Sequence, residues 1–292
     1  MGAYAYRAPS SVEEALSTLA AEAAAGNRAQ MLAGGTDVMV QMRSIDKGPR
    51  TFVDVKHVAE ANELCIGTDE VFIGAAIASA VLNESQELKS ILPGLIEAAD
   101  LIGSTQIQGR ATIGGNLCNS SPAGDTIPAL IACGAVCVIA SSGGNREVPT
   151  EDFVTGVGTN VLEPTEFLVG FKIPRPKGRT SDAYLRFIPR TEMDIAVCGA
   201  GVALTLDDSG VCTAAKVSIG AVAITALVVP DAAAALVGTT VDDAALAAAA
   251  DASSALAKPI TDKRGTVEYR RKVVGVLTKR AAAIARDRAL AL

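Results

Sequence analysis

The sequence predicts an α+β chain of two or three domains, and three observations support that prediction. Its 292 residues exceed what one core usually organises and fit domains of roughly 100 residues each. The first 57 residues alternate helix-like and strand-like segments, which indicates a small subdomain with parallel strands. After a segment rich in Pro, Gly and charge at 174–181, strand-like runs are followed by helical stretches, an order typical of α+β domains.

The N-terminal part opens with helix and strand signals in turn. Ser11-Val-Glu-Glu14 has the pattern of a capping box and predicts the start of a helix rich in Ala and Leu. A short apolar run at 30–33 predicts a strand that leads directly into Gly34-Gly35-Thr36-Asp37. The elements expected here are helices at 12–25 and 38–43 and strands at 30–33 and 51–55.

The middle part changes pattern from about residue 60. Its sharpest feature is the segment 106–116, which ends in Gly114-Gly115-Asn116 after another apolar, strand-like run. We expect Pro93-Gly94 to interrupt two helical pieces, Gly134 to end a short helix and Pro174 to end a strand. The elements expected are strands at 64–66, 71–75, 135–140 and 167–173, a turn at 143–144, and helices at 78–82, 87–92, 95–101 and 126–133.

The C-terminal part predicts strands first and helices afterwards. Its Ala-rich stretches suit packed helices rather than linkers, because Ala has the highest helix propensity. The elements expected are strands at 183–188, 197–206 and 211–219 and helices at 232–236, 242–256 and 267–288.

Composition and charge argue against several classes of function. A net charge of −6 and 3% aromatic residues do not favour nucleic-acid binding, which requires a basic stripe and stacking aromatics. The longest apolar stretch, 217–229, contains Gly220 and stops at Pro230, so we expect no membrane span. The N-terminus lacks the pattern of a signal peptide. We therefore expect a cytoplasmic protein.

Cysteine and histidine usage bears on metal chemistry. Six scattered cysteines, none in a Cys-x-x-Cys pattern, predict reduced buried thiols, with a metal or iron–sulfur site as the alternative. His57 is the only histidine, which excludes a metal site built on several histidines. It also lies far in sequence from both glycine pairs and is a poor candidate for acid–base catalysis.

The two glycine pairs are the features that point to a ligand. Paired glycines let the backbone approach a ligand closely, and successive amide groups can then converge on a phosphate oxygen. Thr36, Asn116 and Ser120 add side-chain donors. Each pair alone is also compatible with a simple tight turn. The Rossmann, P-loop and α/β-hydrolase motifs are all absent from the sequence, which leaves a dinucleotide held by another fold.

Four segments resemble, in order, conserved blocks of one known family. They are Leu32–Asp37, Thr112–Asp125, Arg186–Ala196 and Glu268–Leu277, and together they extend over essentially the whole chain. On these motifs the chain resembles the FAD-binding (medium) subunits of the molybdenum hydroxylase or xanthine dehydrogenase family. Within that family it is similar in pattern to the medium subunit of carbon monoxide dehydrogenase. The second block is long and highly specific.

The resemblance implies a fold and its division. The family has an FAD-binding domain of the vanillyl-alcohol-oxidase (PCMH) type, made of two subdomains. A C-terminal domain with a three-stranded antiparallel sheet and a helical bundle follows. On this chain the parts would be 1–57, 58–177 and 178–292. One subgroup inserts a loop with four cysteines for an iron–sulfur cluster, but 140–152 is short here and has no cysteine, so we expect no cluster in this chain.

The resemblance also implies which residues hold FAD. The first block would wrap the diphosphate from one side and the second would close on it from the other. Ile102 and Leu168 would contact the flavin, and packing in the core is the alternative role for both. Arg186, where relatives have a lysine, would favour reduced, anionic flavin unless it is a surface arginine. The residues implied are Leu32, Ala33, Gly34, Gly35, Thr36, Asp37, Ile102, Thr112, Gly114, Gly115, Asn116, Ser120, Asp125, Leu168 and Arg186.

The function implied is electron transfer rather than substrate chemistry, with no catalytic or metal-binding residue in this chain. A large partner would hold the molybdenum cofactor and a small partner two [2Fe–2S] clusters, in a dimer of heterotrimers. Electrons would reach FAD and leave to a quinone, oxygen or NAD, with no nicotinamide site readable in this sequence. Two alternatives stay open: a stand-alone FAD-dependent oxidase or reductase of the same fold, and a scaffold that has lost FAD.

Overall fold

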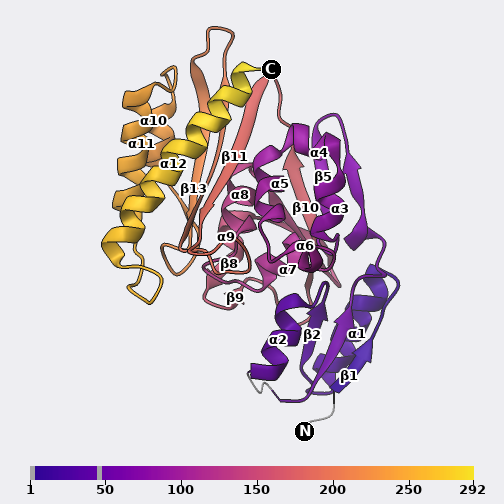
Figure 1. Ribbon diagram of the computed structural model, residues 1–292. Coiled ribbons are helices and arrows are strands. Elements are labelled where there is room, and N and C mark those ends of the chain that lie inside the picture. The colour runs from indigo at the N-terminus through magenta and orange to yellow at the C-terminus, as the bar shows by residue number, and fades with distance from the viewer. Residues whose placement is uncertain (1–3, 45–47) are drawn as a thin grey trace.

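A computed structural model describes residues 4–44 and 48–292, and its larger sheets follow one another along the chain (Figure 1). The first sheet is parallel and has the order β1-β3-β2. Its strands are β1 (Tyr4–Arg7), β2 (Ala29–Leu32) and β3 (Arg50–Asp54), and its helices are α1 (Val12–Ala24) and α2 (Thr36–Ser44). The predicted parallel strands are confirmed. Strand β1 was not predicted from the sequence, because its side chains are mostly exposed.

Ser11 caps helix α1 as predicted, but the Glu14 side chain bonds to a different backbone amide than a capping box would use. The Ser11 hydroxyl accepts from the Glu14 amide at 3.2 Å, as a capping residue should. The Glu14 carboxylate accepts from the backbone amide of Ser10 at 2.8 Å, one residue before the amide that a capping box would use.

The second sheet is antiparallel and has the order β4-β5-β10-β6-β7. Helices join β5 to β6 and bury a large apolar cluster against it. The expected break between two helical pieces is present, but it falls at Leu92 rather than at Pro93-Gly94, because Pro93 occupies the first position of the second helix, where its missing amide costs nothing. The strands are β4 (Leu64–Ile66), β5 (Glu70–Gly74), β6 (Val136–Ser141), β7 (Gly144–Pro149) and β10 (Phe167–Pro174).

Short helices fill the middle part, and a small hairpin lies beside them. A single 3-10 turn, η1 (Glu60–Asn62), precedes the sheet. The other elements are α3 (Ser79–Glu84), α4 (Gln86–Ile91), α5 (Pro93–Asp100), α6 (Thr105–Gln108), α7 (Ile113–Cys118), α8 (Thr126–Ala132), α9 (Thr150–Phe153), β8 (Val154–Gly156) and β9 (Thr159–Asn160).

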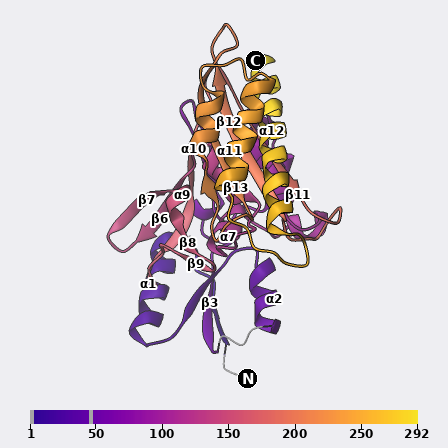
Figure 2. The same cartoon turned by 90° about the vertical axis from the view of Figure 1, so that its left-hand side faces the viewer.

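The third sheet, also antiparallel, has the order β11-β12-β13-β14. The three long strands that the resemblance implied are present, and the two-residue β14 extends the sheet to four within the described residues. Three helices cover one face (Figure 2), and α8 and α5 of the middle part contact the sheet from the other side (Figure 1). The elements are β11 (Arg179–Phe187), β12 (Cys198–Leu206), β13 (Cys212–Gly220), β14 (Leu227–Val228), α10 (Pro230–Leu236), α11 (Asp243–Leu256) and α12 (Val267–Leu290).

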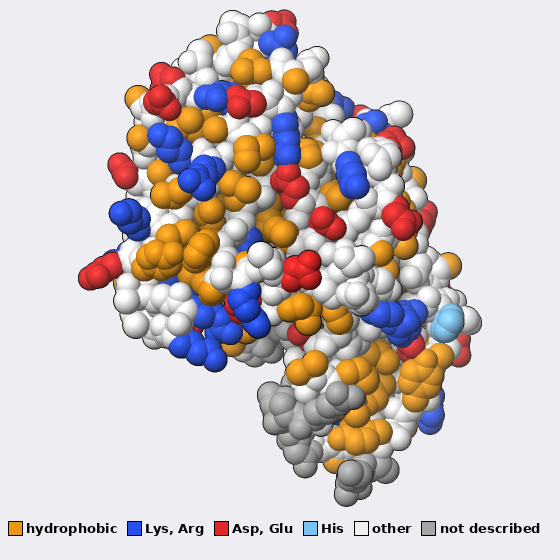
Figure 3. Space-filling model, in the orientation of Figure 1, with side chains coloured by type: hydrophobic (Ala, Val, Ile, Leu, Met, Phe, Trp, Pro, Cys, Tyr) orange, Lys and Arg blue, Asp and Glu red, His pale blue; other side chains and the backbone are white. Residues whose placement is uncertain are grey.

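The surface carries charge of both signs. On the face drawn in Figure 3, acidic and basic side chains are interspersed over the middle and C-terminal parts. Within residues 4–44 and 48–292, none of the helices combines the length and the apolar character that a bilayer crossing requires.

Candidate functional site

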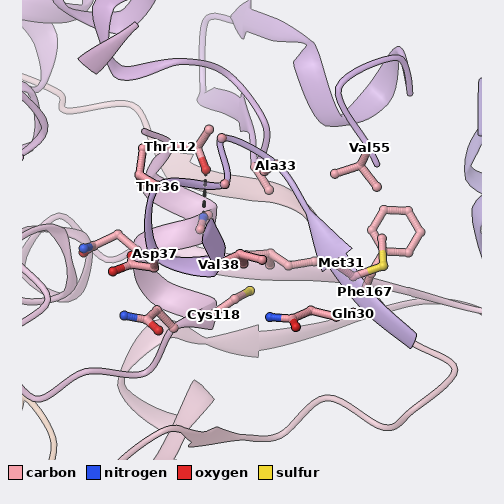
Figure 4. A pocket seen from close by; sticks show the side chains of 18 of the residues that line it. Gln30, Met31, Ala33, Thr36, Asp37, Val38, Val55, Thr112, Cys118 and Phe167 are labelled. Atoms are coloured by element: carbon pink, nitrogen blue, oxygen red, sulfur yellow. Dashed lines mark hydrogen bonds between the residues drawn. The ribbon is translucent and has the colours of Figure 1, made fainter. Parts of the chain in front are cut away.

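A cavity of about 370 Å³ lies where the first sheet meets the middle part. Its wall combines the turn after β2, helix α7 with the residues before it, the β8–β9 hairpin and the start of β10. Figure 4 shows side chains from these segments around it. Most of the residues expected to hold FAD line this cavity: Ala33, Gly34, Gly35, Thr36, Asp37, Ile102, Thr112, Gly114, Gly115, Asn116 and Leu168.

Both residues of the first pair must be glycine, Gly34 because of a close backbone contact and Gly35 because of its backbone conformation. A β-carbon on Gly34 would lie 1.7 Å from the carbonyl oxygen of Arg110. The backbone of the first glycine segment, Leu32–Asp37, therefore touches the residues just before the second glycine segment, Thr112–Asp125. Gly35 has a φ of +77°, which favours glycine. Helix α2 begins at the next residue, Thr36, and its first-turn amides have no acceptor within the helix.

The second glycine pair lies inside a helix, which corrects the expectation that it follows a strand. Thr112 caps α7, and its hydroxyl accepts from the Gly115 amide at 2.8 Å (Figure 4). A β-carbon on Gly114 would lie 2.4 Å from the carbonyl oxygen of Ala75, so this glycine is needed for packing. One on Gly115 would lie 2.9 Å from the Thr112 hydroxyl and meet no other atom within 4 Å, so Gly115 is the glycine of the pair that faces open space at the cavity.

Two helix starts therefore border one cavity. Unpaired amides and the helix dipole make such starts favourable for anions. Gln41 of α2 donates to Asn119, just after α7, at 2.9 Å, and this bond ties the two helices together. The Lys56 ammonium donates to the carbonyl of Ala33 at 3.1 Å, and this bond anchors the first glycine segment. These bonds were not predicted from the sequence, because their donors, Gln41 and Lys56, lie outside the motif segments.

The remaining wall suits the uncharged parts of a dinucleotide. Met31, Val55 and Phe167 supply apolar surface beside the Gln30 amide (Figure 4). The hairpin adds Asn160, whose amide also donates to the Ser120 hydroxyl at 3.2 Å. A largely apolar wall with a few polar groups is typical of cofactor sites.

Three titratable groups in or beside the cavity wall have shifted pKa values: Asp37, Cys118 and Asp54. Partial desolvation of its carboxyl group raises the pKa of Asp37 above its ordinary value. Burial, with a smaller effect of Cys137, raises the pKa of Cys118 to about 12, so this thiol stays protonated. Burial alone would raise the pKa of Asp54, but hydrogen bonds from Lys56 and Tyr6 bring it below its ordinary value.

Four of the expected residues lie outside the cavity wall. Leu32 is buried in β2, and the Ser120 hydroxyl donates to the Leu117 carbonyl at 3.2 Å. The Arg186 guanidinium donates to the Asp125 carboxylate at 2.9 Å, and only 4% of the Arg186 side chain is exposed. Arg186 is therefore not a surface arginine, and Asp125 is its partner.

The cysteines give no metal-binding arrangement. All six lie in the described part of the chain and are unpaired, and Cys65 is exposed, contrary to the expectation of buried thiols throughout. No group of three potential ligands among His, Cys, Asp and Glu gathers in residues 4–44 and 48–292. The segment 140–152 forms the β6–β7 hairpin and the start of α9.

These features define a class of protein. Two helix starts and a glycine that keeps the wall open, outside any Rossmann motif, fit the diphosphate of a dinucleotide cofactor. The apolar end fits its ring systems. The site is that of a nucleotide-binding domain whose cavity lies between two segments distant in sequence.

Comparison with known proteins identifies the family. The FAD binding domain in molybdopterin dehydrogenase matches residues 2–176, and the carbon monoxide dehydrogenase flavoprotein C-terminal domain matches residues 183–285. The carbon monoxide dehydrogenase medium chain of Afipia carboxidovorans is 34% identical over 289 residues, 99% of this chain and 98% of that relative. The xanthine dehydrogenase FAD-binding subunit of Escherichia coli is 35% identical over 183 residues, 62% of this chain and 63% of the relative.

A solved structure agrees along the whole chain. Carbon monoxide dehydrogenase from Hydrogenophaga pseudoflava contains a chain with a TM-score of 0.91 and 32% identity, covering 98% of both chains. The protein therefore belongs to the FAD-binding medium subunits of the molybdenum hydroxylases. It is an oxidoreductase subunit with an FAD-binding domain and a C-terminal sheet domain, which confirms the predicted fold class and cofactor.

Proposed function

We propose that this chain is the electron-transfer subunit of a heterotrimeric molybdenum hydroxylase. It accepts electrons from the [2Fe–2S] clusters of a small partner and passes them to an external acceptor. Bound FAD supplies the ability to exchange electrons singly or in pairs, while the chain binds and orients it. The observation that carries the proposal is the meeting of two glycine segments at one cavity, in a chain that matches a carbon monoxide dehydrogenase medium chain over almost its whole length.

The cavity residues have separate tasks in this proposal. The amides at the start of α2 hold the diphosphate together with those at the start of α7 that Thr112 does not cap, and Gly115 leaves room for it. Ile102 and Leu168 contact the flavin, and the apolar wall near Met31 and Phe167 receives the adenosine end. Leu168 also belongs to the middle core cluster, so packing and contact with the cofactor are compatible there.

The assembly proposed is a dimer of heterotrimers with a molybdenum-cofactor large subunit and a [2Fe–2S] small subunit. Six unpaired cysteines support placement in the cytoplasm, where thiols stay reduced. We also propose the domain division 1–57, 58–177 and 178–292. Its support is that each part contains one of the larger sheets.

Purification of the tagged chain from its native host tests the function. We expect a visible flavin spectrum, two co-purifying chains, and molybdenum and iron in the complex but not in the separated tagged chain. Flavin on a chain that purifies alone, and that reduces or oxidises a substrate alone, would instead establish a stand-alone flavoenzyme. A colourless chain that takes up no added FAD would contradict the cofactor assignment.

A further inference from the structure

A buried ion pair joins the C-terminal sheet to helix α8 of the middle part. Arg186 of β11 donates to Asp125, at the start of α8, over 2.9 Å. The Tyr184 hydroxyl donates to the other carboxylate oxygen at 3.3 Å. Only 4% of the Arg186 side chain and 11% of the Asp125 side chain are exposed. The pair is therefore shielded from solvent, where the loss of one partner leaves an uncompensated charge.

Helix α8 lies directly on the backbone of the same sheet. A β-carbon on Gly201 would lie 2.6 Å from the Pro128 carbonyl oxygen, and one on Gly220 would lie 2.6 Å from the Pro128 ring. No larger residue fits at either position without displacing the helix. These contacts thus set the distance between α8 and the sheet, and the ion pair fixes the position of the N-terminal end of α8.

The same end of α8 holds a residue of the cavity wall. Thr126 donates to the Asn116 side-chain oxygen with its amide at 3.2 Å and with its hydroxyl at 2.7 Å. Asn116 belongs to α7 and lines the cavity. A continuous run of contacts therefore leads from Arg186 through Asp125 and Thr126 to the second glycine segment.

We propose that Arg186 is a positioning residue for FAD, which acts through Asp125 and Thr126 on Asn116 and α7 rather than by touching the flavin. The inference rests on the proposed function, because it assumes that the cavity holds FAD. It assigns the C-terminal domain a task in cofactor retention. A chain whose α8 shifts away from the sheet loses the orientation of the second segment, although both glycine pairs are intact.

The test compares FAD affinity and the visible circular dichroism of bound FAD in full-length variants. Arg186→Met is expected to raise the FAD dissociation constant about tenfold or more and to change the dichroism, because Asp125 loses its partner. Arg186→Lys is expected to restore most of both, because the positive charge returns. Thr126→Val keeps the shape of the side chain but removes the hydroxyl bond to Asn116. It is expected to weaken FAD binding without leaving a buried charge unpaired.

Asp182→Ala is the matched control. Asp182 is a second buried carboxylate at the same boundary, but it accepts from the amides of Gly94 and Leu95 at the start of α5 and has no bond to the second segment. We expect this variant to lower the unfolding temperature and to leave the FAD dissociation constant unchanged.

Three outcomes would overturn the inference. Arg186→Met and Thr126→Val could both retain wild-type affinity and dichroism. Asp182→Ala could weaken FAD binding as much as they do, which would show general destabilisation. Arg186→Lys could fail to restore binding. If Arg186→Met does not fold, Thr126→Val and Arg186→Lys still decide the question. A wild-type chain that binds no FAD would instead contradict the proposed function itself.

Discussion

Gly34 packs directly against the carbonyl group of Arg110, so closely that a β-carbon on residue 34 would lie 1.7 Å from that oxygen. This contact joins the turn after β2 to the residues that precede α7. The cavity exists because two segments far apart in sequence meet here, backbone against backbone.

Gly34→Ala is expected to destabilise the chain by about 3 kcal/mol or more and to abolish FAD retention, because a β-carbon cannot fit against backbone. Gly109→Ala is the control in the neighbouring turn, since its β-carbon would meet only a carbonyl oxygen at 3.8 Å. We expect the control to stay within about 0.5 kcal/mol of wild type. Urea unfolding and flavin content after purification measure both effects. Equal stability of the two variants would contradict the proposed contact.

Gly115→Ala and Gly114→Ala are expected to separate binding from folding. At Gly115 the new methyl group would lie 2.9 Å from the Thr112 hydroxyl that caps α7, so FAD affinity falls at least about tenfold while stability falls by no more than about 1 kcal/mol, the value of a helix cap. At Gly114 it meets the backbone and side chain of Ala75 within 2.5 Å, so stability falls by about 1–3 kcal/mol. Fluorescence titration and thermal unfolding measure the two properties. The reverse pattern would exclude the cofactor role of Gly115.

Lys56→Met is expected to weaken FAD binding and to cost about 1–3 kcal/mol of stability. The variant removes the bond to the Ala33 carbonyl at 3.1 Å and leaves the buried Asp54 with Tyr6 as its remaining side-chain donor. Titration with FAD and urea unfolding test it, and Lys172→Met is a control because Lys172 forms an exposed ion pair with Glu147. An effect no larger than that of Lys172→Met would exclude a role for Lys56 at the site.

The stability of the chain is expected to depend on pH through Asp182. Burial raises the pKa of this carboxyl to about 6, although the amides of Gly94 and Leu95 act against the shift. An unfolded Asp has a pKa near 3.9, so between about pH 4 and 6 the folded state binds more protons than the unfolded state. The stabilising contribution of Asp182 is therefore fully present below about pH 4 and lost as the pH rises through 6.

Asp182→Asn isolates that contribution, because the amide does not titrate. The free energy of unfolding of wild type relative to Asp182→Asn is expected to increase as the pH is lowered from 7 to 4.5. Asp125, whose pKa is also raised to about 6, titrates in both proteins and cancels in the difference. Urea unfolding at both pH values provides the measurement. A difference that does not change with pH would show that Asp182 titrates normally.

Local signals in the sequence were enough for most of the fold. The Ser11 cap, the stop at Gly134 and the strand end at Pro174 lie where expected, because each depends on the conformational preference of a few adjacent residues. The exposed edge strand β1 was missed, because it has no apolar alternation to mark it. The break between two helices near Pro93 was expected, but Pro93 and Gly94 belong to the second helix, since proline is favoured at the first helical position.

The sequence by itself determined the family, the fold class and the two segments that line the cavity. Their residue types follow from local chemistry: glycine where backbone must approach, and threonine where a helix must begin. Only the tertiary structure decided that Gly114 and Gly115 start a helix, that Lys56 supports Ala33, and that Arg186 pairs with Asp125 outside the cavity wall. Those facts depend on which distant segments touch, and burial and ion pairing arise only when the chain brings them together.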